Sequence, residues 1–448
     1  MKQHLLDRQK HQAIWHIAWP LMLSNTAVPL LGLVDTAVLG HLEFAWYMGA
    51  AAVGGNIFTF IFWAFGFLRM GTTGLTAQSY GAKDGPRSFG ILIQGCLTAL
   101  LISLLIILTQ AWIFPIAIEW IGGTKEVRAA SLLYCQLRVW GAPATLMQFV
   151  LAGWLIGTQQ AKILMGILLF VNAMNIILDV LLVVVFDLDI RGVALATVAS
   201  EYLGLILSLF FVKKYFESGQ NNFSLKQIAF TPLRAFFQVN GDIFIRTCLL
   251  TFVFAFFTAQ GARQSDEMLA ANAVLITFLM LIANSLDGFA NAAEAKAGEY
   301  TGQFRRQGSA VLPDFHGSNL VAGFWSAIFA VVLLLVFALF GATLIDVLTD
   351  LPMVADIAKE YLVWLVWMPL ITFLSFLFDG VFIGTTKTKE MRNVMFICLF
   401  VVFFPTWYLS QGWGNHGLWL SLTVFMLARS LLMGQRYISM SYRNTWFE

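Results

Sequence analysis

Residues 134–162, YCQLRVWGAPATLMQFVLAGWLIGTQQAK, align without gaps on residues 361–389, YLVWLVWMPLITFLSFLFDGVFIGTTKTK. Ten of the 29 aligned positions are identical, whereas ordinary residue frequencies give about two identities by chance. A weaker match at an offset of 220 residues pairs, among others, Tyr80 with Tyr300. The chain is therefore predicted to consist of two diverged copies of one unit.

The composition predicts an integral membrane protein. Of the 448 residues, 59% are hydrophobic and only 12% are charged, and the mean hydropathy is +0.77. Soluble domains contain about 25% charged residues. The apolar runs are long and continuous, which favours spans of about 20 residues in helices over the alternating segments of about 10 that build β-barrels. The basic N-terminus has no small-residue cleavage site after its apolar run, so we interpret it as a tail leading into the first span.

Twelve transmembrane helices are expected in an all-α fold of two pseudo-symmetric six-helix lobes. The predicted spans are about 14–39, 48–76, 88–113, 127–157, 162–186, 192–213, 238–262, 268–298, 316–347, 354–384, 392–410 and 415–435. Seventeen of the 27 Lys and Arg residues fall on the side that holds both termini, and five fall on the other side. Because positive charge marks the cytoplasmic side, both termini are predicted to be cytoplasmic.

The longest polar break divides the chain near its midpoint. We predict an N-lobe over residues 1–212, a cytoplasmic linker over residues 213–234 and a C-lobe over residues 235–448. Since each copy has an even number of spans, the pseudo-two-fold axis runs along the membrane normal. Many transporters are built in this way and work by alternating access. The alternatives at this point are a channel or a duplicated structural scaffold.

Two aspartates lie inside apolar spans of the first half. A charge at the bilayer centre costs about 2.5–3.5 kcal/mol on insertion scales, so such residues usually serve an ion or proton path. Asp35 lies near the outer end of span one, and Asp179 lies about two turns from the outer end of span five. Asn175 is one turn deeper on the same face, and Thr197 has a similar depth in span six. These four residues form the predicted substrate and cation pocket.

The two predicted proton-coupling residues are Asp35 and Asp179. Burial and a neighbouring like charge both favour the protonated form of a carboxylic acid, as a proton-coupled carrier requires. The same oxygens suit a sodium ion, and a structural hydrogen-bonded pair is the simpler alternative. In the second copy, Ala255 and Phe404 occupy the equivalent positions, which argues against a merely architectural role.

Other polar or unusual residues suggest moving parts. Pro20 and Pro29 allow span one to kink, and we predict a hinge at Pro20. Arg69 and Asp287 have similar depths in equivalent spans of opposite lobes and form a candidate gate on the cytoplasmic side, although a structural salt bridge within a lobe is an equal alternative. Further intramembrane charges are Asp242, Arg246 and Glu201, of which the last has Arg138 as a candidate partner.

Signatures of soluble enzymes are not found in the sequence. There is no G-x-x-x-x-G-K-[ST] phosphate loop, and the six histidines show no metal-ligand spacing. The four cysteines lie in apolar spans without metal or disulfide spacing and are interpreted as small core residues. We therefore expect neither an enzyme, nor a metal, nor a cofactor other than a coupling ion, nor a nucleic-acid partner.

Several ordered motifs resemble the multidrug and toxic compound extrusion (MATE) family, in particular its DinF-like bacterial branch. The resemblance covers nearly the whole chain. The motifs are WPLMLSN, VDTAVLGHL, TTGLTAQSYGAKD, NIILDV, GVALATVASEY, GWLIGTQQAK and GVFIGTTKTK.

The resemblance implies two six-helix lobes that form a V around a central cleft, and export of organic, often cationic or amphipathic compounds in exchange for protons or sodium. In the family, the first-helix aspartate after a proline kink matches Asp35 and Pro20. The Asn-x-x-x-Asp of the fifth helix matches Asn175 and Asp179, and a sixth-helix threonine matches Thr197.

Sodium-coupled members that use acids in the second lobe match less well. The seventh span has no acid beyond Asp242, and Asp379 does not align clearly with their pattern. The resemblance therefore favours proton coupling through the first lobe.

The predicted function is a proton-coupled multidrug antiporter of a bacterial inner membrane. It is expected to act as a monomer on small organic substrates, in contact with membrane lipid. The rival functions are a sodium-coupled antiporter that uses the same oxygens, and a flippase for lipid or polysaccharide, for which a more basic cleft is expected.

Overall fold

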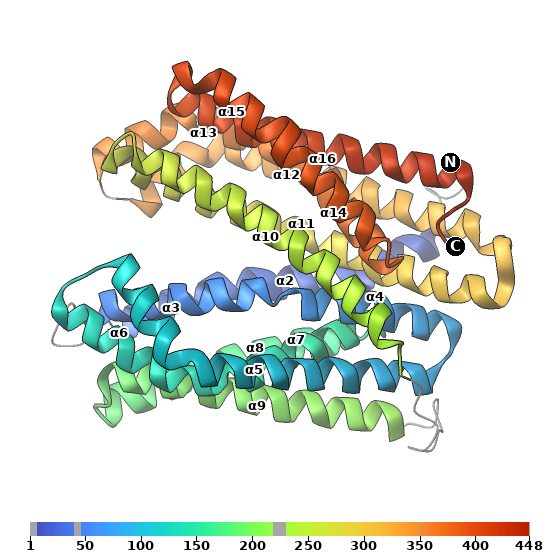
Figure 1. The fold of residues 1–448 in the computed structure, drawn as a ribbon, viewed down its shortest axis with the longest axis horizontal. Helices are drawn as coiled ribbons and strands as arrows, with labels where there is room; N and C mark the ends of the chain where they lie inside the picture. The colour runs from blue at the N-terminus through green and yellow to red at the C-terminus, as the bar shows by residue number, and fades with distance from the viewer. Residues whose placement is uncertain (1–6, 40–45, 218–229, 350, 448) are drawn as a thin grey trace. The chain divides into compact units, whose positions relative to one another are not determined.

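The computed structural model describes residues 7–39, 46–217, 230–349 and 351–447, except for the side chains of residues 26–39. These residues are almost entirely helical and contain no strand (Figure 1). Among the described residues, ten segments are long and apolar enough to cross a membrane, and one of them, of 83 residues, contains both α11 and α12. Together with α2, they give the twelve membrane-length segments expected from the sequence.

The helices of the first half follow one another with short connections. They are α2 (Arg8–Leu39), α3 (Trp46–Ala64), α4 (Phe67–Ala82), α5 (Gly85–Ile121), α6 (Lys125–Arg138), the 3₁₀ turn η1 (Val139–Gly141), α7 (Ala142–Gly157), α8 (Ala161–Asp179), the π-helical segment η2 (Val180–Val185) and α9 (Asp189–Glu217).

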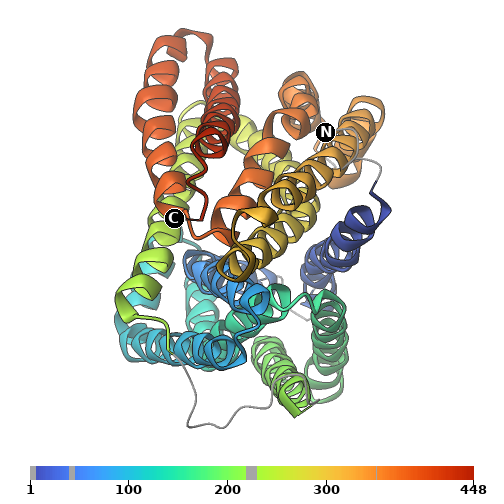
Figure 2. The same ribbon diagram turned by 90° about the vertical axis from the view of Figure 1, so that its right-hand side faces the viewer.

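The second half contains the corresponding set, seen from a second direction in Figure 2. Its members are α10 (Leu233–Ala262), α11 (Asp266–Gln307), η4 (Gly308–Val311), α12 (Leu312–Leu348), α13 (Pro352–Gly384), α14 (Thr388–Ile397), the π-helical segment η5 (Cys398–Phe403), α15 (Phe404–Ser410), η6 (Gln411–Trp413) and α16 (Asn415–Arg443).

Some of the predicted spans are composite. The span predicted over residues 48–76 is divided between α3 and α4 by a turn, and the span over residues 392–410 includes the π-helical segment η5. The span over residues 127–157 changes from α6 through η1 to α7, where Pro143 occupies the first turn. Proline lacks an N–H group, so it fits the start of a helix but not its interior.

Contacts divide the chain into two compact units. The first-half unit comprises Leu23–Leu233, and the second-half unit comprises Arg234–Glu448 together with Met1–Met22. This division differs from the predicted lobes, because the beginning of α2 belongs to the second-half unit. In addition, α9 continues to Glu217, beyond the predicted start of the linker at residue 213.

Side chains of α2 attach its beginning to α11 and α12. The ammonium of Lys10 lies 2.9 Å from Oδ1 of Asp314, and the ring of Trp15 packs edge-on against Phe289. Trp325 Nε1 donates a hydrogen bond of 2.8 Å to Nδ1 of His11. Aromatic edge contacts and hydrogen bonds of this kind explain why residues 7–22 pack with the second half.

Lys10 stays charged at this junction. Burial lowers the pKa of Lys10, but the carboxylates of Asp314 and Asp7 outweigh this effect and raise the pKa above its usual value. The ion pair with Asp314 is therefore retained at physiological pH.

The end of the linker is anchored to α5. Gln94 Nε2 donates a hydrogen bond of 2.7 Å to the carbonyl oxygen of Thr231, and the backbone N–H of Thr231 donates one of 3.1 Å to Gln94 Oε1. Both residues are buried. The chain therefore leaves the first-half unit only at the start of α10.

The first copy of the repeated stretch packs closely through two glycines of α7. A Cβ atom added at Gly153 would lie 2.3 Å from the backbone oxygen of Arg69, and one at Gly157 would lie 2.8 Å from that of Thr73. Because no side chain separates the backbones, α4 and α7 approach each other directly, as small residues allow in membrane helices.

The second copy repeats this arrangement between α11 and α13. A Cβ atom at Gly380 would lie 2.1 Å from the backbone oxygen of Ala290, and one at Gly384 would lie 2.2 Å from that of Glu294. Gly380 and Gly384 are the residues aligned with Gly153 and Gly157. The predicted duplication is thus confirmed by the packing of the helices. This packing also explains why the glycines are identical in the two copies.

We expect Gly380→Ala to destabilise the protein by about 1–3 kcal/mol, because backbone must move to admit the new methyl group. Gly166→Ala is the matched control, since a Cβ atom there meets nothing within 4 Å and alanine favours a helix by up to about 1 kcal/mol. Unfolding of both variants in detergent measures the difference. Equal stability of the two variants would contradict the close packing.

Candidate functional site

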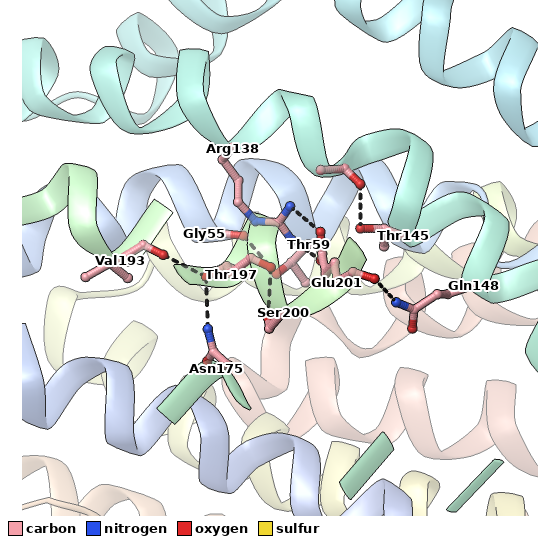
Figure 3. Close-up of polar contacts among 11 residues, drawn as sticks. Gly55, Thr59, Arg138, Thr145, Gln148, Asn175, Val193, Thr197, Ser200 and Glu201 are labelled. Carbon is pink, nitrogen blue, oxygen red and sulfur yellow. Dashed lines mark hydrogen bonds and ion pairs between the residues drawn. The ribbon is translucent and has the colours of Figure 1, made fainter. Parts of the chain in front are cut away.

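The structure brings together two of the predicted pocket residues, Asn175 and Thr197 (Figure 3). Asn175 lies on α8 and Thr197 on α9, and the amide Nδ2 donates a hydrogen bond of 3.4 Å to the threonine Oγ1. The hydroxyl of Thr197 in turn donates to the carbonyl oxygen of Val193 at 2.9 Å. The side chain of Asn175 is 1% exposed, and no group among the described residues donates a hydrogen bond to its Oδ1.

Asp179 ends α8 one turn beyond Asn175 and is fully buried. Residues four apart on a helix lie on one face, with Cβ atoms about 5–6 Å apart. The π-helical segment η2 begins at the next residue, and such segments are frequent at functional sites. Gly192 of α9 packs against η2, because a Cβ atom there would lie 2.8 Å from Val183. The site therefore combines a buried carboxylate with an amide oxygen free to accept a hydrogen bond.

Two predicted residues of this region lie on α2. The side chain of Asp35 is outside the described residues, so its place in the site stays a prediction. Pro20 is buried within α2, and the boundary between the two compact units follows Met22. The predicted hinge thus lies two residues before the point where α2 passes from one unit to the other.

Glu201 is held by Arg138, the partner suggested by the sequence. The two groups form a bidentate pair with distances of 2.9 Å from Nη1 to Oε2 and 2.5 Å from Nη2 to Oε1 (Figure 3). The guanidinium also lies over the rings of Phe58 and Phe62, 5.2 and 5.5 Å from their centroids. Gln148 donates to the backbone oxygen of Glu201 at 2.5 Å. Glu201 therefore neutralises a buried cation and joins α6, α7 and α9.

The second-half unit contains a buried charge cluster that the sequence analysis missed. Asp379 on α13 forms ion pairs with both Arg246 of α10 and Arg429 of α16. All three side chains are at least nine-tenths buried. Arg429 also lies over the ring of Phe376. The sequence does contain a sign of this cluster, since one acid and two arginines lie inside apolar spans. Such charges need partners within a membrane.

Both carboxylate oxygens of Asp242 likewise have partners. Its Oδ1 lies 2.6 Å from Nη1 of Arg392, and its Oδ2 accepts a hydrogen bond of 3.1 Å from the hydroxyl of Thr388. These contacts join α10 to the start of α14. Asp242 and Arg246 thus have separate partners on α14 and α13.

The candidate gate residues belong to different units. Arg69 lies on α4 of the first-half unit, and Asp287 lies on α11 of the second-half unit. Their pairing stays a prediction.

The sequence matches the MatE family model over residues 20–181 and 243–409. These ranges exceed half of the chain and lie one in each copy of the repeat. The chain belongs to the MatE family. Members of this family are multi-pass membrane transporters and not enzymes.

Curated relatives agree with this assignment. The chain is 40% identical to DNA damage-inducible protein F of Escherichia coli strain K12, in an alignment that covers 97% of this chain and 94% of the relative. It is 24% identical to the probable multidrug resistance protein NorM of Acinetobacter baylyi, with 95% of each chain covered. The resemblance to the DinF-like branch is therefore confirmed.

The fold agrees with solved MATE structures. A variant of the MATE transporter VcmN from Vibrio cholerae superimposes with a TM-score of 0.84 at 18% identity, over 98% of this chain and 99% of that one. The expected all-helical MATE fold is thereby confirmed.

We expect Arg138→Met to destabilise the protein by about 3–5 kcal/mol, because it leaves the carboxylate of Glu201 buried without its counter-charge. Adding Glu201→Met should restore most of this loss. Lys213→Met is the control, since its pair with Glu217 is exposed and should contribute less than about 1 kcal/mol. Denaturation in mixed micelles measures all variants. A double variant as unstable as the single one would contradict a structural role for the pair.

Proposed function

We propose that this MATE protein is a secondary active antiporter that exports small organic compounds, cationic or amphipathic, in exchange for protons. It would work by alternating access as a monomer in a bacterial inner membrane, with both termini in the cytoplasm. Export of such compounds is suggested by the names of relatives, such as the multidrug resistance protein NorM and the multidrug export protein MepA of Staphylococcus aureus.

The observation that carries proton coupling is the site on α8 and α9. Asp179 is fully buried, and one turn away Asn175 offers a buried amide oxygen with no hydrogen-bond donor among the described residues. A protonated carboxylic acid is such a donor, whereas a carboxylate is not. Uptake of a proton therefore changes the hydrogen bonds that this site can make.

Three other acids inside the helices are less suited to this role. Asp379 faces two arginines, and Asp242 and Glu201 each face one. Binding a proton or sodium ion at these carboxylates would remove the charge that neutralises a buried guanidinium, which is costly.

In the proposed mechanism, Asp35 carries the proton. Asn175, Asp179 and Thr197 set its affinity for protons and form the pocket for the organic substrate. Protonation bends α2 near Pro20, the pocket becomes smaller, and the substrate is released outward. Deprotonation toward the cytoplasm then restores the straight helix and a pocket that attracts cations.

The test is efflux of a fluorescent organic cation from liposomes that contain the purified protein, driven by a pH gradient or by a sodium gradient. We expect flux with the pH gradient alone, and a loss of at least about tenfold in Asp35→Asn and in Asp179→Asn, because an amide carries no titratable proton. Asp346→Asn is the matched control. This acid pairs with Lys359, is half-exposed, and should not affect flux.

Three outcomes would overturn parts of this proposal. Proton-driven flux that persists in Asp35→Asn would exclude Asp35 as the proton carrier. Flux that requires sodium at constant pH would make the acids a sodium site, as in the rival antiporter. Absence of dye flux together with movement of lipid between leaflets would indicate a flippase.

The gate on the cytoplasmic side is tested by charge reversal. Arg69→Asp and Asp287→Arg should each reduce flux, and the double variant should recover it, if the two charges attract each other when that side is closed. The control is reversal of the half-exposed pair of Arg436 and Glu390, which are 3.4 Å apart and should contribute little. Failure of the double reversal to rescue flux would rule out the gate.

A further inference from the structure

A cavity of about 840 Å³ lies within the second-half unit. It is bounded by the first turns of α12, the last part of α13 and the end of α16. Its volume falls in the range of about 300–1,000 Å³ typical of small-molecule sites. The cavity belongs to neither the first-half site nor the charge cluster at Asp379.

The walls of the cavity are mainly apolar. Leu320, Leu374, Leu377 and Phe378 line its inner part. Its rim includes Ile438 and Tyr442, which are 56% and 86% exposed. None of the described lining residues is Asp, Glu, Lys or Arg. The cavity therefore suits an uncharged ligand and offers no counter-charge for an organic cation.

One end of the cavity contains three connected polar side chains. Nδ1 of His316 lies 2.8 Å from the hydroxyl of Tyr437, and Asn319 Nδ2 donates a hydrogen bond of 3.4 Å to the same oxygen. The phenol oxygen thus contacts both side chains, and the imidazole tautomer decides whether it donates to His316 Nδ1 or accepts from it.

Asn319 supplies the observation that points to a ligand. The residue is 5% exposed and lines the cavity, yet its Oδ1 accepts no hydrogen bond from any described residue. A buried acceptor without a donor costs about 1–3 kcal/mol. A hydroxyl or N–H group of a bound molecule would satisfy it.

The polar end and the apolar end lie at different depths. His316 begins the predicted span nine and Tyr437 follows the predicted span twelve by two residues, so both lie near the predicted membrane surface. Leu320 and Phe324 follow one and two turns further along α12, toward the hydrocarbon. Tyrosine is also frequent at membrane interfaces. The cavity thus has the polarity of an amphiphile lying parallel to the lipid chains.

We propose that this cavity binds an uncharged amphiphile, with a hydroxyl-bearing head at Asn319 and His316 and a hydrocarbon body between α12 and α13. The site is separate from the proposed transport site and does not rest on the proposed function. Both a membrane lipid and a neutral exported compound have this chemistry.

The test is photolabelling of the full-length protein in vesicles of phosphatidylethanolamine and phosphatidylglycerol, with a monoacylglycerol that carries a diazirine on its acyl chain. We expect adducts on peptides that contain residues 313–324 and 437–442, and competition by unlabelled monoacylglycerol. Leu320→Trp, which places an indole ring in the cavity, should reduce these adducts about tenfold, equivalent to about 1.4 kcal/mol.

Val331→Trp is the matched control, because residue 331 lies three turns further along the same face of α12, is 44% exposed and is not part of the cavity. It should leave the adducts unchanged. Asn319→Leu should reduce labelling by the monoacylglycerol about fivefold, as expected for loss of one hydrogen bond, but should not reduce labelling by a diazirine hydrocarbon without a hydroxyl group.

Adducts spread evenly over the lipid-exposed helices, or equal labelling of wild type and Leu320→Trp, would overturn the proposal. So would an equal loss in Val331→Trp. Competition identifies the source of the ligand. Displacement by monoacylglycerol but not by a neutral transported dye supports a lipid, and displacement by the dye supports an exported compound.

Discussion

A buried charge within these membrane-length helices requires a partner of opposite charge, and this constraint shapes both units. In the first-half unit, the pair of Arg138 and Glu201 joins α6 to α9. In the second-half unit, Asp379 lies between two arginines and joins α10, α13 and α16. Removing one partner of such a group leaves an uncompensated charge in a medium of low dielectric constant. These acids are therefore committed to holding helices together.

These structural acids differ in their surroundings from Asp179, for which we propose a role in transport. Asp179 lies at the junction of α8 and a π-helical segment. One turn away, the amide oxygen of Asn175 accepts no hydrogen bond from any described residue. The second copy has Phe404 at the aligned position and a charge cluster elsewhere. Divergence after duplication thus retained the same helix packing, through the paired glycines of α7 and α13, while the polar interiors of the two copies became different.

Much of this arrangement could be predicted from the sequence, for physical reasons. Apolar length predicts the helices, and the spacing of Asn175 and Asp179 places them on one face because both lie on one helix. The cluster at Asp379 could not be predicted in this way, because its partners are 133 and 50 residues away along the chain. The π-helical segments and the polar group around Tyr437 also depend on packing between helices. The periodicity of residues within one helix does not predict such packing.

Because α2 is shared between the two compact units, the protein cannot be divided into these units by a single break in the chain. The chain passes between the compact units twice, after Met22 within a continuous helix and after Leu233 at the start of α10. A break in the linker would yield two fragments that correspond to the two copies of the repeat but not to the two compact units. The first fragment would carry the 22 residues whose Lys10, His11 and Trp15 dock on α11 and α12. Neither fragment would then contain a complete compact unit. The two would assemble only if the beginning of α2 in the first fragment packed against α11 and α12 of the second, as in domain swapping.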